Sequence, residues 1–488
     1  MTQPLHRTLI ACIALAAFAS RARAGAQEPA NGSRSNAARL ERWVGTWHGT
    51  LAAGAGVRLA LTIRQDSTGA LNGLMRNVDQ PDVQAIAAIG VSGDTLRFAI
   101  AGEHITFVGV ANAAGDSIRG IFSQGATLPL TLARAPSSSL AAAVSTRPQT
   151  PQPPFPYRSE DVSIPSVNGV RLAGTVILPR GAGPFPAVVF ITGSGAQDRD
   201  ETILGHHPFL VIADFLARHG IASLRYDDRG YARSTGNFDA ATSADFADDA
   251  EAAVRFLQGV SGIARDRVGI IGHSEGGLIG PLVATRTRDV AFVVMLAGPG
   301  LPGDSLTPLQ LRRIAAASGE APAQTEARAA VNSKLVHAVA DAKDSADALV
   351  KLAAIRERML ASLPEAQRSS AAARFDQSIP ALIRPWMRFF LRYDPRPVLE
   401  KVRVPVLALG GSLDTQVPAR ENLAAIDTAL RKGGNRDYRV VELPKLNHLF
   451  QTAITGASSE YATIDETFSP QVLDLVSSWI NERFARPK

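Results

Sequence analysis

The stretch Val268-Gly269-Ile270-Ile271-Gly272-His273-Ser274-Glu275-Gly276-Gly277 decides the fold of this chain. An apolar strand, Val268–Ile271, runs directly into a G-x-S-x-G motif, and the helical pattern Leu278–Arg286 follows it. The chain must reverse sharply here with the serine at the apex, so small residues are needed on both sides. The hydroxyl would stand at a helix N-terminus, whose dipole favours negative charge. Ser274 is therefore the candidate nucleophile of a serine hydrolase.

A serine hydroxyl becomes a good nucleophile only beside a base, and the base needs a carboxylate to orient it. Asp414 lies in the turn after the apolar strand Val404–Leu409, and His448 lies in a loop just past the next strand. The chain order serine, aspartate, histidine is typical of α/β hydrolases. Glu421 and Asp437 remain alternatives for the acid. The alternative interpretation of His448 is a loop histidine without a catalytic role.

Acyl transfer also needs backbone N–H donors aimed at the oxyanion. We expect one donor at Glu275, which follows the nucleophile, and the other at Ser194, in the glycine-rich loop Thr192–Gly195 after the strand Ala187–Ile191. Such glycines also occur in phosphate-binding loops, but neither G-x-G-x-x-G nor a Lys-Ser/Thr ending is present. The sequence therefore predicts no cofactor.

We assign structural rather than catalytic roles to the remaining polar residues near these motifs. We interpret His273 as a packing residue, pointing away from the nucleophile. His206 and His207 are adjacent rather than four apart, so they do not predict a zinc site, and we expect no metal. We interpret Asp198, Asp200 and Glu201 as part of a solvated loop.

The elements around Ser274 predict a doubly wound, mostly parallel α/β sheet. Several strand candidates are apolar on both faces, as buried parallel strands must be. The strand candidates are Val170–Leu178, Ala187–Ile191, Ile221–Tyr226, Val268–Ile271, Val290–Leu296 and Val404–Leu409, and the helices are His207–His219, Ser243–Leu257 and Leu278–Arg286. From residue 304 to residue 396 this alternation stops, and an Ala-, Arg- and Leu-rich helical insertion intervenes.

The N-terminal part of the chain has a different pattern. Residues 38–134 predict a small antiparallel β domain, with short alternating strands such as Val57–Ile63 and a Trp43/Trp47 pair that we expect in its core. Residues 135–156 are rich in Ala, Ser, Thr and Pro and predict a linker to the catalytic domain, residues 157–488.

Residues 1–24 have the layout of a secretory signal peptide, with basic Arg7, an apolar run and small residues at the end. We therefore expect an exported protein, periplasmic or secreted. Cys12 is the only cysteine, so the mature protein would have no thiol.

The net charge is +6, and it falls to +3 once Arg7, Arg21 and Arg23 are removed. No basic cluster remains, so we expect no nucleic-acid partner. No later apolar run is long enough for stable membrane insertion. The sequence does not fix the oligomeric state.

Beyond residue 157 the sequence resembles bacterial α/β-hydrolase esterases, with relatives among serine aminopeptidases and acyl-peptide hydrolases. The resemblance rests on residues 192–200, residues 225–230, Gly272–Gly277 and Asn447-His448. It implies the same nucleophile, acid, base and oxyanion positions. One departure is Ala232, which stands where relatives carry a second glycine before Ser234.

The resemblance also implies that residues 304–396 form a helical cap over the site. The cap segment Trp386–Leu391 is a candidate wall of an acyl pocket, although such aromatic residues more often form a cap's own core.

We therefore predict a serine hydrolase that cleaves small-molecule carboxylic esters through an acyl-enzyme. The alternatives are a serine peptidase or amidase that uses the same groups, in which Asp198, Asp200 and Glu201 would bind a free amine, and a ligand-binding protein with an inactive hydrolase domain.

Overall fold

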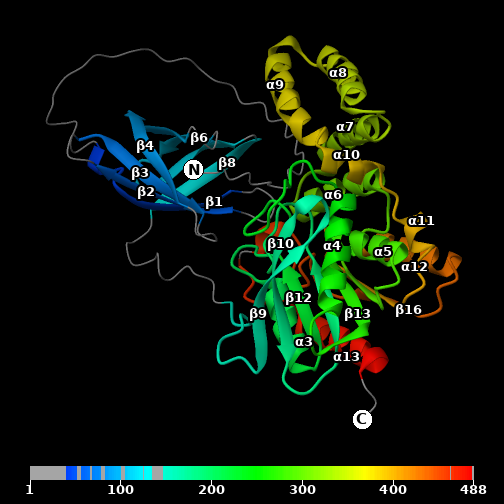
Figure 1. The fold of residues 1–488 in the computed structure, drawn as a ribbon. Coiled ribbons are helices and arrows are strands. Elements are labelled where there is room, and N and C mark those ends of the chain that lie inside the picture. Colours follow the sequence, from blue (N-terminus) through cyan, green and yellow to red (C-terminus); the bar gives the residue numbers. More distant parts are fainter. Residues whose placement is uncertain are drawn as a thin grey trace. The chain divides into compact units, whose positions relative to one another are not determined.

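The fold was analysed on a computed structural model (Figure 1). The structure describes residues 40–51, 57–65, 69–77, 83–100, 105–124, 126–134, 147–461 and 463–485. The predicted signal peptide, residues 1–24, lies outside these ranges, as do residues 135–146 of the predicted linker.

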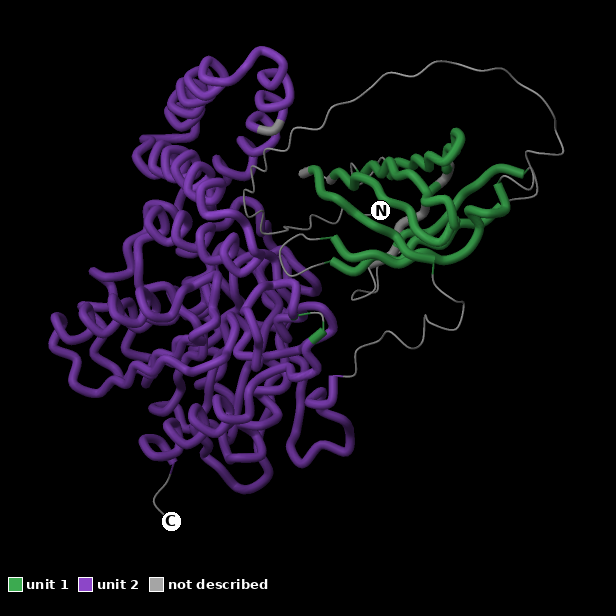
Figure 2. Tube along the Cα trace, turned by 180° about the vertical axis from the view of Figure 1, so that it is seen from behind, with its two compact units in different colours: residues 1–6, 13–146, 461–463 green, residues 7–12, 147–460, 464–488 purple. Residues whose placement is uncertain are grey.

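The chain divides into two compact units, coloured separately in Figure 2. The first unit holds the N-terminal strands β1–β8, and the second holds all elements from β9 to α13. The second unit begins at Arg147, within the segment that the sequence predicts as a linker. Arg147 donates a hydrogen bond to the carbonyl of Leu204 over 2.6 Å, and Gln149 donates one to Phe468 over 2.7 Å. Residues 147–156 are therefore fastened to the hydrolase unit.

The first unit is a closed antiparallel barrel of eight strands. Its strands are β1 (Gly45–Leu51), β2 (Val57–Gln65), β3 (Leu71–Asn77), β4 (Val83–Ser92), β5 (Thr95–Ile100), β6 (Ile105–Ala111), β7 (Ser117–Gln124) and β8 (Ala126–Arg134). Residues alternate between buried and exposed along β5 and β6, as the pleat requires when one face lines a core. Trp43 and Trp47 are fully buried in that core, as predicted, and Trp47 Nε1 donates a hydrogen bond to the Trp43 carbonyl over 3.0 Å.

The second unit is built on an eight-stranded sheet in the order β16-β15-β14-β13-β11-β12-β10-β9. The pairs from β12 through β16 are parallel, whereas β9 and β10 are antiparallel to their neighbours. The strands are β9 (Tyr157–Pro165), β10 (Arg171–Pro179), β11 (Phe185–Ile191), β12 (Ala222–Tyr226), β13 (Ile263–His273), β14 (Val293–Leu296), β15 (Val406–Gly411) and β16 (Tyr438–Leu443). The fold is the predicted α/β hydrolase with an added N-terminal β domain.

Helices cover both faces of this sheet (Figure 1). One core lies under α4 (Ser243–Gln258), α5 (Glu275–Arg286) and α12 (Ala419–Lys432), and the other lies under α3 (Pro208–Arg218) and α13 (Pro470–Phe484). Along β11, Val189 and Ile191 enter the first core, whereas Val188 and Phe190 enter the second. A strand apolar at every position is therefore what a sheet covered on both faces needs.

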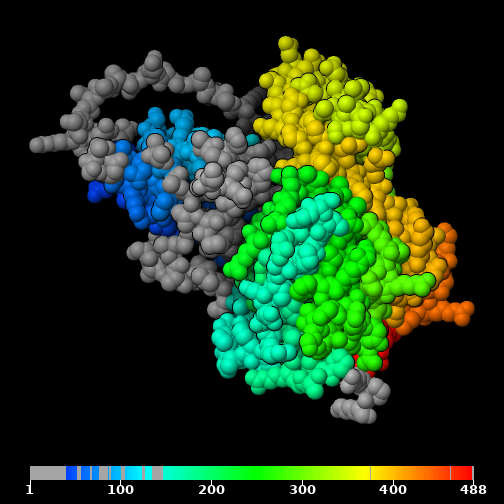
Figure 3. Space-filling view, viewed as in Figure 1, coloured from blue at the N-terminus to red at the C-terminus, as the bar shows by residue number. Residues whose placement is uncertain are grey.

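The helical insertion between β14 and β15 contains α6 (Gly303–Ala317), α7 (Pro322–Ala340), α8 (Ser345–Ala361), α9 (Glu365–Leu382) and α10 (Pro385–Arg392). In Figure 3 it projects as a yellow lobe beyond the green and cyan body of the hydrolase unit. The short helix α11 (Arg396–Leu399) leads back to the sheet. A Cβ atom at Gly303 would lie 2.0 Å from the Phe390 carbonyl oxygen. Helices α6 and α10 therefore meet backbone to backbone at the base of this lobe.

The predicted elements differ from the observed ones mainly at their ends. Helix α5 begins at Glu275 rather than Leu278, because Gly276 and Gly277, weak helix formers, still adopt helical geometry beside the elbow. Strand β13 begins at Ile263, five residues before the predicted start. Among the helices that the structure describes, none combines the length and the apolar character needed to cross a bilayer.

Candidate active site

Ser274 occupies a strained turn between β13 and α5. Its backbone has φ 51° and ψ −115°, a conformation that non-glycine residues rarely adopt. A Cβ atom at Gly272 would lie 2.0 Å from the Gly276 carbonyl oxygen, and one at Gly276 would lie 2.1 Å from the Ile191 carbonyl oxygen. Both glycines are therefore required for backbone contact, as predicted. Ser274 stays partly exposed between two buried neighbours, so the turn presents a single accessible hydroxyl.

The two loops that follow β15 and β16 bring Asp414 and His448 together. The distance between His448 Nδ1 and Asp414 Oδ2 is 2.8 Å, and both side chains are buried. The other carboxylate oxygen, Oδ1, accepts the backbone N–H groups of Gln416 and Val417, each over 2.8 Å. A carboxylate held in this way accepts the Nδ1–H of His448 and leaves Nε2 as the basic nitrogen.

The two alternative acids make other contacts. Glu421 pairs with Arg313 at 2.6 Å, and Asp437 pairs with Arg483 at 2.9 Å. Asp414 is thus the carboxylate that the structure brings to His448.

Asn447 shapes the loop that carries His448. It is fully buried, and its Oδ1 accepts the backbone N–H groups of Leu449 and Gln451 over 3.0 and 2.9 Å. Its Nδ2 donates to Gln451 Oε1 over 2.9 Å, and Gln451 Nε2 lies 3.1 Å from His206 Nε2. His206 therefore supports this loop.

The hydroxyl of Ser274 makes no hydrogen bond to His448 within the part of the chain that the structure describes. The two residues are nevertheless linked through His273, whose ring centroid lies 4.8 Å from that of His448. Catalytic hydrogen bonds are often long in unliganded enzymes and tighten when substrate is bound. The structure thus bonds Asp414 to His448 and bonds His448 to the nucleophile turn through His273.

The two expected oxyanion donors lie at the same turn. Glu275 is the first residue of α5, so its N–H has no acceptor within the helix. The Gly193 N–H is occupied, because it donates to Glu201 Oε1 over 2.7 Å. Among the described residues the Ser194 N–H has no hydrogen-bond partner. The Ser194 N–H therefore remains open to a substrate oxygen, whereas the Gly193 N–H does not.

His273 is a hydrogen-bonding residue, so the interpretation as mere packing was wrong. Its Nδ1 lies 2.8 Å from Glu201 Oε1, and its Nε2 donates to the backbone carbonyl of His448 over 2.9 Å. Burial disfavours the charged imidazolium, but the charge and hydrogen bond of Glu201 raise the pKa of His273 above its ordinary value. Glu201 is only 4% exposed, so the interpretation as part of a solvated loop was also wrong.

The carboxyl group of Glu275 is buried directly after the nucleophile. Burial raises its pKa to about 7, against hydrogen bonds that lower it. Its Oε1 accepts the hydroxyl of Ser243 over 2.6 Å and the indole N–H of Trp386 over 2.7 Å. Trp386 belongs to α10, where its ring stacks on Phe390 at a centroid distance of 5.3 Å. The cap segment singled out from the sequence therefore reaches the nucleophile turn.

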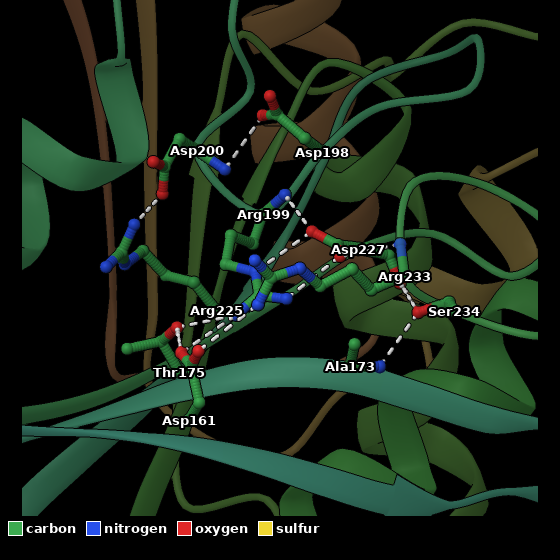
Figure 4. A network of polar contacts seen from close by, with 10 residues as sticks. All are labelled: Asp161, Ala173, Thr175, Asp198, Arg199, Asp200, Arg225, Asp227, Arg233 and Ser234. Carbon is green, nitrogen blue, oxygen red and sulfur yellow. Dashed lines mark hydrogen bonds and ion pairs between the residues drawn. The ribbon is translucent and has the colours of Figure 1, made fainter.

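A polar network fixes the chain after the Ser194 loop (Figure 4). Arg199 holds Asp227 with two parallel hydrogen bonds of 3.0 and 2.9 Å. It also donates to Thr175 over 2.7 Å and to Asp161 over 3.2 Å. Arg225, buried beneath it, pairs with Asp200. The charged motif thus anchors the loop to β9, β10 and β12.

The carboxylate of Asp228 accepts two hydrogen bonds from the segment that contains Ser194. Its Oδ1 accepts the Thr192 hydroxyl and its Oδ2 accepts the Gln197 N–H, each over 2.8 Å. Burial raises the pKa of Asp228 well above its ordinary value, against these hydrogen bonds. The turn that follows contains Ala232, whose φ of 46° lies in the left-handed region that favours glycine.

No cluster of three or more His, Cys, Asp or Glu side chains suited to a metal ion occurs among the described residues. The candidate site itself combines a strained serine turn, a carboxylate-bound histidine and backbone N–H groups without an internal acceptor.

Comparison with known proteins places these residues in a family. The profile of the X-Pro dipeptidyl-peptidase (S15) family matches residues 168–441, a span that contains Ser274 and Asp414. The esterase EstD of Thermotoga maritima is 35% identical over 159 residues, which are 33% of this chain and 37% of EstD. The match thus spans little more than a third of that relative.

Solved structures give a fold-level likeness. The Pyrococcus furiosus esterase Pf2001 is 15% identical, with 67% of this chain and 93% of that chain covered and a TM-score of 0.39. Est1E of Butyrivibrio proteoclasticus, solved with ferulic acid, is 15% identical, with 66% and 96% covered and a TM-score of 0.39.

Proposed function

This chain belongs to the X-Pro dipeptidyl-peptidase (S15) family of α/β hydrolases, and on that premise we propose that it cleaves carboxylic esters through an acyl-enzyme. The observation that carries the proposal is the 2.8 Å hydrogen bond between His448 and Asp414, beside the strained turn of Ser274. These three side chains have the roles of base, orienting acid and nucleophile.

The reaction proceeds in two halves. Ser274 Oγ attacks the ester carbonyl carbon while its proton passes to His448 Nε2, and the N–H groups of Ser194 and Glu275 stabilise the oxyanion. As the tetrahedral intermediate collapses, the C–O bond to the alcohol breaks, and His448 gives its proton to the leaving oxygen. Water then attacks the acyl-enzyme in the same way, releases the acid and restores Ser274.

The family match raises peptide hydrolysis as a second candidate function. A dipeptidyl-peptidase must hold the free amine of its substrate, and the sequence offers Asp198, Asp200 and Glu201 for this task. Each of these has an internal partner. Asp198 Oδ1 accepts the N–H groups of Asp200 and Thr202, each over 3.0 Å, Asp200 pairs with Arg225, and Glu201 holds His273. Because these carboxylates already bond to other groups of the protein, they are less available to a substrate amine. This supports esters over peptides with a free N-terminus.

A direct comparison of substrates tests the proposal. We expect turnover of a short p-nitrophenyl ester that is lost in Ser274→Ala, with X-Pro p-nitroanilide cleaved at much lower kcat/KM. Higher kcat/KM for the anilide would instead establish a peptidase. Turnover of neither substrate, with a folded protein, would leave the ligand-binding alternative.

We also propose that the protein is exported. The N-terminal residue of the mature protein would show whether residues 1–24 are removed.

A further inference from the structure

We propose that Glu201 and His273 form a buried ion pair that positions the catalytic base relative to the nucleophile and the oxyanion loop. Neither residue touches the reacting atoms, so both are positioning residues. This inference rests on the proposed function of Ser274 and His448.

One carboxylate oxygen connects the oxyanion loop with the nucleophile turn. Glu201 Oε1 accepts the Gly193 N–H over 2.7 Å and also faces His273 Nδ1 at 2.8 Å. Gly193 directly precedes Ser194, and His273 directly precedes Ser274. Loss of the carboxylate would therefore free both segments at once.

His273 extends this connection to the loop of the base. Its Nε2 lies 2.9 Å from the backbone oxygen of His448, which can only accept a hydrogen bond. Nε2 must therefore carry a proton, and Nδ1 faces a carboxylate that also accepts rather than donates. Both ring nitrogens then donate, so the ring is an imidazolium. The hydrogen-bond pattern thus makes the pair ionic.

The backbone conformation of Glu201 and the burial of both side chains each have a cost in free energy. Glu201 adopts φ 53°, a left-handed conformation that glutamate rarely adopts. The side chains of His273 and Glu201 are 7% and 5% exposed, so water screens their charges little. A strained, buried ion pair at a functional site persists only where the surrounding contacts determine it.

Two substitutions at Glu201 separate the ion pair from the bond to the oxyanion loop. In Glu201→Gln the amide oxygen can still accept the Gly193 N–H, but a neutral His273 that donates from Nε2 has no Nδ1–H to give to the same oxygen. Glu201→Gln therefore removes the ion pair and keeps the bond to Gly193, whereas Glu201→Ala removes both. The matched control is Glu466→Ala, because Glu466 also accepts a backbone N–H, that of Thr452 at 2.6 Å, but its hydrogen bonds go to Thr452 and not to Gly193 or His273.

Kinetics on a p-nitrophenyl ester and the rate of Ser274 labelling by a fluorophosphonate provide the readouts. We expect Glu201→Ala to lower kcat and the labelling rate about 100-fold, with KM changed less than about threefold, because small displacements of catalytic groups cost that much. We expect Glu201→Gln, which loses the ion pair but keeps the bond to Gly193, to lower kcat by a smaller factor than Glu201→Ala. Glu466→Ala should change neither quantity.

A folded Glu201→Ala variant with wild-type kcat and labelling rate would overturn the inference, and so would a Glu201→Gln variant with wild-type kcat. The ion pair is also measured without substrate, from the ¹⁵N shifts of the His273 ring, assigned by their loss in His273→Gln. Both nitrogens should be protonated at neutral pH in the wild type but not in Glu201→Gln. A neutral ring in the wild type would refute the pair. Wild-type protein that shows the pair but no ester turnover would refute only the proposed function.

Discussion

The indole Nε1 of Trp386 donates a hydrogen bond to Glu275 Oε1 over 2.7 Å, so the cap is bonded to the residue after the nucleophile. The same oxygen accepts the hydroxyl of Ser243, the first residue of α4, over 2.6 Å. Glu275 has a pKa raised by burial to about 7. The strength of the contact between cap and nucleophile turn therefore depends on a carboxyl group that titrates near neutral pH.

Replacement of Trp386 by phenylalanine tests this contact, because it keeps an aromatic ring and removes the N–H donor. A hydrogen bond to a charged group contributes about 1.5–3 kcal/mol, against about 1 kcal/mol for a neutral pair. We expect Trp386→Phe to lose more unfolding free energy at about pH 8, where Glu275 is ionised, than at about pH 5. Urea titrations at both pH values measure the difference.

Trp479→Phe provides the matched control, since Trp479 is buried and its Nε1 has no hydrogen-bond partner among the described residues. This variant should lose the same free energy at both pH values. Equal losses for Trp386→Phe as well would show that the bond to Glu275 contributes nothing dependent on charge.

Glu275→Gln should remove the pH dependence that Glu275 imposes on stability. The pKa of Glu275 is about 7 in the folded protein, against an ordinary value of 4.5. Between these values the folded state binds more protons than the unfolded state, so stability falls as pH rises. The loss levels off above pH 7 at about 3 kcal/mol, since each pKa unit corresponds to about 1.4 kcal/mol.

Glutamine keeps an oxygen for Ser243 and Trp386 and does not ionise. The variant should therefore gain stability relative to the wild type from about pH 4.5 to pH 7, measured by urea unfolding across this range. Parallel stability curves for the two proteins would contradict a buried, titrating Glu275.

The sequence predicts the hydrolase fold well because its signals are local. The elbow needs two glycines within five residues, and both meet neighbouring backbone as expected. Strands buried on both faces read as continuous apolar runs, and β11 enters both cores. The acid and the base are predicted because each follows a strand at the same edge of the sheet.

The Glu201–His273 pair could not be predicted in this way. Its members are 72 positions apart, and Glu201 follows Asp198, Arg199 and Asp200 in a stretch whose polarity suggests exposure. The burial of Glu201 arises from the tertiary packing that brings it to His273 at the end of β13. The contact between Trp386 and Glu275 spans 111 positions and depends on how the cap docks, which local patterns do not encode.

The network around Arg199 should contribute to both stability and activity. Arg199 holds Asp227 through two hydrogen bonds, and their side chains are 14% and 3% exposed. Lysine carries the charge but lacks the planar pair of donors, so one bond to Asp227 would be lost. We expect Arg199→Lys to cost about 2–4 kcal/mol of unfolding free energy, because it weakens a buried ion pair.

The activity of this variant should fall about tenfold in kcat, because Arg199 fixes the chain that follows Ser194. Arg233→Lys is the control. Arg233 is 75% exposed and approaches Asp161 only at 3.4 Å, so its replacement should change stability by less than about 0.5 kcal/mol. Equal effects of the two substitutions would mean that the paired hydrogen bonds from Arg199 to Asp227 contribute nothing specific to stability or activity.

The identity of the catalytic acid is tested by exchange of each candidate carboxylate for its amide. Asp414 Oδ2 accepts from His448 Nδ1, so Asp414→Asn presents an amide in place of a charged acceptor and favours the wrong tautomer of the histidine. We expect kcat to fall about 10³–10⁴-fold with KM changed only a few-fold, since the substrate contacts remain. Asp437→Asn removes the alternative acid, which pairs with Arg483 at the surface, and should keep kcat within about twofold. The opposite ranking of the two variants in kcat would assign the orienting carboxylate to Asp437 and require the loop of His448 to adopt another position during catalysis.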